Sequence, residues 1–154
     1  MKAMLMLTGK LLITTTFFLL LGFFKTNAQT ALPLADSLDK WSEPVERFIA
    51  QEGTPKIRVK SKVIKHFGTT GVIEVEIKNI SDRTLTAAFG LKVTRGDAND
   101  NLIHPNNMYQ LNLKPNFKTT YKMELRECLP KGARKMNDIE KCQACQPRLL
   151  FIWN

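Results

Sequence analysis

The fold is decided by one stretch of the sequence, Val72-Ile73-Glu74-Val75-Glu76-Ile77-Lys78-Asn79-Ile80-Ser81-Asp82-Arg83-Thr84-Leu85. From position 73 to position 78, apolar and charged residues alternate without interruption. A period of two places the apolar side chains on one face of a strand and the charged side chains on the other. Asn79, Ser81 and Asp82 are residues that favour turns. The stretch therefore predicts a half-buried strand, a turn and the start of a second strand.

The same alternation recurs on both sides of this stretch. Further strands are expected at 57–67, 84–94, 108–113, 117–125 and 148–153, the last of them apolar on both faces. Polar and glycine-containing turn signals separate these strands, and no helical pattern lies between them. Residues 54–154 are therefore predicted to form one mainly β domain, an antiparallel sandwich of about six or seven strands.

A family resemblance supports this fold class. The strand that runs into Asn79-Ile80-Ser81 and on to Leu85 resembles the strand–turn–strand pattern of bacterial extracytoplasmic immunoglobulin-like and fibronectin-type-III-like modules. The step Leu113-Lys114-Pro115, followed by Tyr121, is similar to a later part of the same modules. The resemblance covers less than half of the chain, and the chain lacks the cysteine pair and core tryptophan of antibody domains. It implies an immunoglobulin-like sandwich that binds or spaces other molecules.

Residues 29–53 have a different pattern, with apolar residues spaced by three and four. Leu34, Leu38, Trp41, Val45 and Phe48 would line one face of a helix. Pro44 would kink or restart that helix, because proline has no N–H to donate. The pattern predicts an N-terminal helical segment, which either packs on the β domain or binds a partner.

Residues 1–28 have the composition of a cleavable signal peptide of bacterial type. Lys2 and Lys10 precede an apolar run at 11–24, and small residues at 26–28 offer a cleavage site before Gln29. The run is shorter than the roughly 20 apolar residues that a spanning helix needs. The sequence predicts an exported protein, periplasmic or extracellular, that does not span the membrane once the signal is cleaved.

The whole chain has 23 basic and 14 acidic residues and a formal net charge of +9. The 20 basic and 14 acidic residues that follow position 28 give the predicted mature chain a charge of +6. One basic run alternates with apolar residues and comprises Lys56, Arg58, Lys60, Lys62 and Lys65. This run is typical of the solvated face of a strand, and it is also a candidate site for an acidic glycan or a lipid headgroup. Nucleic acid is not expected, because no aromatic stacking motif accompanies the charges.

Three cysteines, Cys128, Cys142 and Cys145, are disulfide candidates, because exported proteins meet oxidising conditions. An odd number leaves one thiol over. Cys142 and Cys145 also form a C-x-x-C, so a thiol-disulfide redox protein is an alternative function, although the strand–helix context of such motifs is missing. A zinc site would need a fourth ligand such as His66 or His104.

No catalytic signature stands out elsewhere. The loop 97–101 begins like a calcium loop but has Leu102 and Met108 where the glycine and the bidentate glutamate are expected. Asn79-Ile80-Ser81 matches a glycosylation acceptor pattern, yet the same residues are expected in a turn. We predict no enzymatic activity, no cofactor and no resident metal.

The sequence thus predicts a non-enzymatic binding or structural module of the cell envelope or extracellular space, with a protein or glycan partner. The redox protein and a polyanion-binding surface module are the two alternatives.

Overall fold

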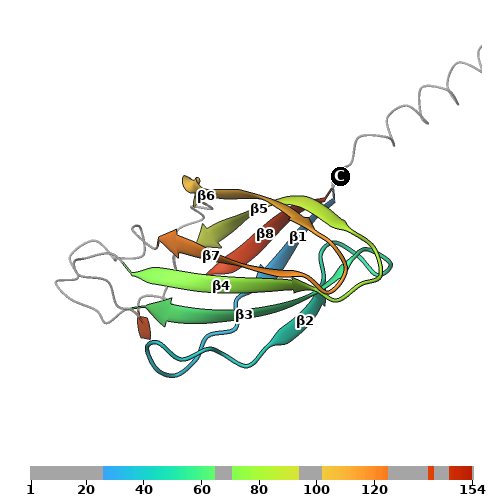
Figure 1. Cartoon of the computed structure of the whole chain (residues 1–154). Helices are drawn as coiled ribbons and strands as arrows, with labels where there is room; N and C mark the ends of the chain where they lie inside the picture. Colours follow the sequence, from blue (N-terminus) through green and yellow to red (C-terminus); the bar gives the residue numbers. More distant parts are fainter. Residues whose placement is uncertain (1–25, 65–70, 94–101, 125–138, 141–145, 154) are drawn as a thin grey trace, which may run out of the picture.

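The computed structural model describes residues 26–64, 71–93, 102–124, 139–140 and 146–153. Within these ranges the chain is mainly β, with eight strands in two antiparallel sheets (Figure 1). In chain order the strands are β1 (Thr26–Ala31), β2 (Val45–Phe48), β3 (Lys56–Ile64), β4 (Val72–Asn79), β5 (Leu85–Val93), β6 (Leu102–Leu113), β7 (Lys118–Glu124) and β8 (Arg148–Trp153). One sheet has the order β1-β8-β5-β6 and the other the order β2-β3-β4-β7.

The burial of side chains along the strands follows the alternation in the sequence. In β3, Ile57 and Val59 are completely buried, and in β4 Ile73, Val75 and Ile77 are as well. Together with residues of β5, β6, β7 and β8 they form one hydrophobic core that draws on both sheets. This arrangement is consistent with a β-sandwich, in which the inward-facing residues of two sheets share a core.

Four aromatic rings, two of them in the core and two packed against it, join the two sheets. Phe89 of β5 stacks on Tyr109 of β6 and Phe151 of β8, with ring centroids 5.5 and 5.7 Å apart. It also meets Tyr121 of β7 edge-on at 4.9 Å. The Tyr109 hydroxyl donates to the Lys122 carbonyl of β7 at 2.8 Å, so the cluster links the sheets by packing and by a hydrogen bond.

The turn after β4 is organised by the buried side chain of Asn79. Its amide nitrogen donates to the carbonyls of Arg83 and Leu113 at 2.8 and 2.9 Å, and its oxygen accepts from the N–H and hydroxyl of Ser81. The predicted turn is therefore correct. The Asn79 amide nitrogen donates two hydrogen bonds, and the side chain is buried. The geometry of the turn therefore accounts for asparagine and serine at these positions.

The predicted N-terminal helical segment at 29–53 is wrong. The described chain there forms the end of β1, a bent linker and β2. The N–H groups of Asp39 and Ser42 donate to the carbonyls of Val63 and Ser61 in β3, at 2.9 and 2.8 Å. These donors are used between segments and not within a helix, while Val45–Phe48 pairs with β3. The apolar residues spaced as in a helix divide accordingly, because Leu38 packs against the core whereas Phe48 is 40% exposed.

Strand β6 begins at Leu102, six residues earlier than the alternation indicates. Its pairing with β5 shifts between Gly90 and Lys92, where Lys92 pairs with Ile103 and Gly90 with Met108. Such a bulge accommodates residues that break the alternation, including Pro105. Among the described residues, no helix is long and apolar enough to cross a membrane.

Candidate functional site

The outer face of the sheet β2-β3-β4-β7 carries more than half of the basic residues in the described part of the chain. Because Ile57 and Val59 point into the core, their neighbours on β3 point outward. The same alternation applies to β4 and β7. The basic residues that this face gathers are Lys56, Arg58, Lys60, Lys62, Lys78, Lys118 and Lys122.

The strand register arranges these side chains in rows across the sheet. Arg58 of β3 pairs with Lys78 of β4, and Lys78 pairs with Lys118 of β7. We call these three residues the cationic row. The next row holds Lys60, Glu76 and Thr120, so its charges balance. Like charges directly opposite one another destabilise a sheet. In this row Glu46, opposite Arg58 in β2, and Glu76, which pairs with Lys118, offset part of the repulsion.

Two glutamates of β4 neutralise part of the face. Glu76 accepts from Lys60 at 3.3 Å and from Lys118 at 2.8 Å. Burial alone would raise the pKa of Glu76, but its bonds with Lys118 and Lys60 outweigh burial and lower that pKa. Glu74 accepts from Lys62 at 2.9 Å and from Lys122 at 3.4 Å. Its bond with Lys62 is the largest cause of its lowered pKa, so both carboxylates are ionised at neutral pH.

Glu46 of β2 plays the same part at the edge of the sheet. It accepts from Lys56 at 2.7 Å and also pairs with Arg58. The bond with Lys56, followed by the bond with Arg58, lowers the pKa of Glu46 to about 2. Arg58 is therefore held at its β2 side and keeps its remaining N–H donors for another acceptor.

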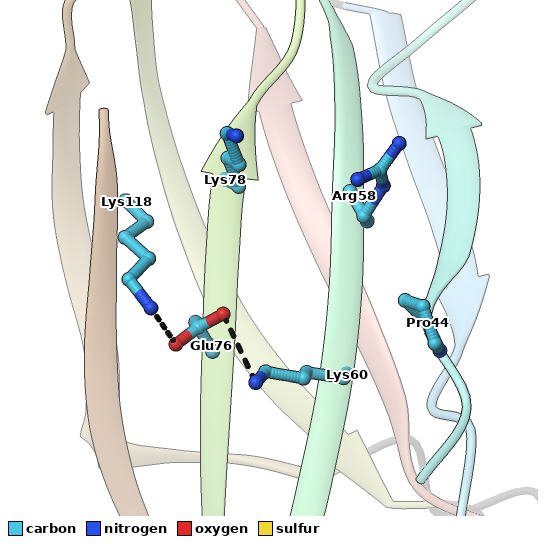
Figure 2. A pocket seen from close by; sticks show the side chains of 6 residues that line it. All are labelled: Pro44, Arg58, Lys60, Glu76, Lys78 and Lys118. Carbon is cyan, nitrogen blue, oxygen red and sulfur yellow. Dashed lines mark hydrogen bonds and ion pairs between the residues drawn. The ribbon is translucent and has the colours of Figure 1, made fainter. Parts of the chain in front are cut away.

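Lys78 differs from its neighbours, because it has no ion pair among the described residues. It lies at the centre of the cationic row, between Arg58 and Lys118. Figure 2 shows its side chain pointing away from the Glu76 carboxylate, which is engaged by Lys60 and Lys118. The surplus positive charge of the row is thus concentrated at Lys78.

A groove of about 350 Å³ opens over the cationic row (Figure 2). It is lined by Pro44, Arg58, Lys60, Glu76, Lys78 and Lys118. Four cationic groups against one carboxylate can hold an anionic group by charge-assisted hydrogen bonds. The polar lining of the groove consists of these four cations and one carboxylate, which suits it to binding an anionic group.

One aromatic residue borders this face. The Nζ atoms of Lys60 and Lys62 lie 4.5 and 5.3 Å from the centre of the Trp41 ring. Trp41 also forms an isolated bridge with Lys62, so the linker before β2 is tied to β3 at this point. Both lysines therefore contact the Trp41 ring as well as a glutamate of β4.

Four of the five polyanion candidates from the sequence, Lys56, Arg58, Lys60 and Lys62, lie together on this face, and Lys65 lies outside the described residues. Lys78 and Lys118 are not among the candidate binding residues that the sequence predicts. Their alternation with inward residues was visible, but their position opposite Arg58 depends on strand pairing.

The other site predictions fall outside the part of the chain that the structure describes. This holds for Cys128, Cys142, Cys145, His66 and the loop 97–101. His104 lies on the backbone of β6, but its side chain is outside the described part. Within the described ranges, no three His, Cys, Asp or Glu side chains are grouped so that they could hold a metal ion.

Comparison of the chain with protein-family models, with curated proteins and with solved structures found no match. The function must therefore be inferred from the charged face itself.

Proposed function

We propose that this chain is an exported, non-enzymatic binding module of the cell envelope or extracellular space, and that it binds an acidic glycan through the cationic row. The anionic groups of the glycan occupy the groove over Arg58, Lys78 and Lys118. Glu76 and Glu74 hold the surrounding lysines in place. Binding is electrostatic, so it weakens as salt rises.

The observation that carries this proposal is the cationic row. Three basic residues face one another across three strands, and Lys78 among them has no ion pair within the described residues. Like charges opposite one another are unfavourable in a sheet, and the neighbouring rows instead place Glu76 opposite Lys60 and Glu74 opposite Lys62. A row that concentrates like charge over a groove favours an anionic ligand.

The proposed fold is an immunoglobulin-like sandwich, and the strand order supports it. In that fold one sheet holds neighbouring strands A, B and E, and the other holds C, F and G, with C′ added beside C in some members. Here β3-β4-β7 has the pairing of A, B and E, and β6-β5-β8 has the pairing of C′, C and F. The place of G beside β8 is taken by β1, a strand from the N-terminal end.

Binding of the exported protein to heparin, a sulfated and carboxylated glycan, tests the proposal. Lys78→Gln should weaken binding roughly fivefold at low salt, equivalent to about 1 kcal/mol for one exposed charge contact. Lys92→Gln makes the same charge change in the other sheet and should leave the affinity within twofold.

An equal loss of heparin affinity in both variants would mean that binding depends only on net charge, and it would overturn the assignment to the cationic row. Vesicles that contain anionic lipid form the second arm of the test. Stronger binding to these vesicles than to heparin, with the same dependence on Lys78, would transfer the site from glycans to lipid headgroups.

A further inference from the structure

The predicted signal-peptide cleavage falls inside a strand of the folded protein. β1 pairs with β8 from Thr26 opposite Trp153 to Ala31 opposite Arg148. Cleavage before Gln29 removes the first three residues of β1 and leaves the last three in place. The part of β8 that loses its partner is therefore Phe151–Trp153.

After cleavage, this part of β8 would be paired only with β5, on its other side. Phe151 pairs with Phe89 of β5, and Ile152 and Trp153 pair with Ala88 and Ala87. On the β1 side, cleavage leaves main-chain N–H and C=O groups of an apolar segment without a strand to bond to. An edge of this kind is a template for pairing with another chain.

We propose that removal of the leader turns Phe151–Trp153 into an open edge and that this edge pairs with the same edge of a second copy of the chain. The two copies are related by a two-fold axis perpendicular to the sheet, with Ile152 opposite Ile152 of the second copy. Phe151 then lies opposite Trp153 of the second copy. The β1-β8-β5-β6 sheets of the two copies become one continuous sheet.

Three features of the chain favour a second copy as the occupant. An antiparallel edge is self-complementary about a two-fold axis, so it needs no strand of another sequence. Phe151–Trp153 carries no charged side chain, so two copies of a basic protein meet there without like charges in contact. The nearest charge on β8, Arg148, lies in the part of the strand that stays paired with β1, and the cationic row belongs to the other sheet.

The proposal rests on the export and cleavage in the proposed function, and it is independent of the anionic ligand. The first measurement is therefore the intact mass of the exported protein. A mass that begins at Gln29 establishes the open edge. A mass that retains Thr26–Ala28 keeps β8 paired and overturns the proposal, whereas heparin binding through the cationic row is unaffected.

Sedimentation of the exported protein over a range of concentrations then tests the pairing. The weight-average mass should approach twice that of the monomer as the concentration rises. A chain that begins at Thr26, and so contains every described strand, should stay monomeric. A monomeric exported protein, or equal dimerisation of both chains, would contradict the proposal.

Two variants of the exported protein exclude an effect of unfolding. Ile152→Lys places a charge at the centre of the proposed two-fold and should shift the protein to monomer with an unchanged circular dichroism spectrum. Thr86→Lys introduces the same charge at an exposed position of β5 and should leave the dimer intact. A dimer that survives Ile152→Lys would rule out pairing through β8. A dimer that is lost equally in both variants would show that it depends on net charge.

Discussion

Asn79 is the residue on which the turn between β4 and β5 depends. Its side chain is buried and uses both amide hydrogens and its carbonyl oxygen. In Asn79→Asp, a carboxylate oxygen replaces the donor that faces the carbonyls of Arg83 and Leu113. We expect the free energy of unfolding to fall by about 2 to 3 kcal/mol, the range for leaving buried acceptors unpaired. Urea denaturation measures this change.

Asn112→Asp is the matched control, because Asn112 is exposed on β6. It should change the free energy of unfolding by less than about 0.5 kcal/mol. Equal effects of the two substitutions would mean that Asn79 is not the organising residue of the turn.

The ion pairs of Glu46 predict how the stability of the protein changes at acid pH. Its pKa is about 2 in the folded chain and 4.5 as a free side chain, so its ion pairs contribute stability above about pH 4.5. That contribution is lost as the pH falls from 4.5 through about 2, because protonation removes the charge. A carbon-detected NMR titration of the Glu46 carboxyl should give a midpoint near 2.

Removing the main partner tests the cause of this shift. In Lys56→Gln the midpoint of Glu46 should move up toward 4.5, since Lys56 is the largest cause of the lowering. High salt should move it in the same direction, because the pair is exposed and screened. A midpoint that stays near 2 in Lys56→Gln would contradict the assignment.

At the scale of the element, β4 combines opposing roles on its outer face. Lys78 supplies the surplus charge of the groove, and Glu76 holds Lys60 and Lys118 beside it. Glu76→Gln removes the only carboxylate among the described residues that line the groove. Binding of heparin should therefore tighten, by roughly three- to fivefold at low salt, as expected for one exposed charge.

Glu52→Gln is the control for net charge, because Glu52 is exposed in the turn between β2 and β3. Its effect on the heparin affinity should stay within twofold. If the two substitutions tighten binding equally, Glu76 has no specific influence on the groove.

The N-terminal elements show where sequence patterns fail. The spacing of Leu34, Leu38 and Trp41 fits a helix, but it takes no account of the partners that the linker finds on β3. The buried hydroxyl of Ser61 donates to the Pro33 carbonyl, and the Ser42 hydroxyl accepts from the Ser61 N–H at 3.1 Å. These hydrogen bonds join positions far apart in the chain, so they cannot be predicted from the local spacing of apolar residues.

At the scale of the whole molecule, the strands that alternate cleanly were predictable and their pairing was not. The periodicity of β4 and the apolar composition of β8 predict these strands, because burial in a common core favours both patterns. The cationic row depends on the registers of β3, β4 and β7, which bring Arg58 and Lys118 to either side of Lys78. A single sequence carries no direct record of such registers.

The aromatic cluster tests whether the two sheets share one core. Phe89→Ala removes the ring that contacts Tyr109, Tyr121 and Phe151, and it should lower the free energy of unfolding by about 3 to 5 kcal/mol. Phe117→Ala should cost much less, since Phe117 is 62% exposed. Thermal and urea denaturation of both variants measure the difference, and similar losses would argue against the shared core.

The central claim is that the cationic row binds an anionic ligand. Titration of isotope-labelled protein with a heparin oligosaccharide, followed through its amide and side-chain NMR signals, tests this claim most directly. The account predicts that the largest changes occur at Arg58, Lys78 and Lys118, and that they diminish with added salt. Changes confined to the β1-β8-β5-β6 sheet, or no changes at low salt, would contradict it.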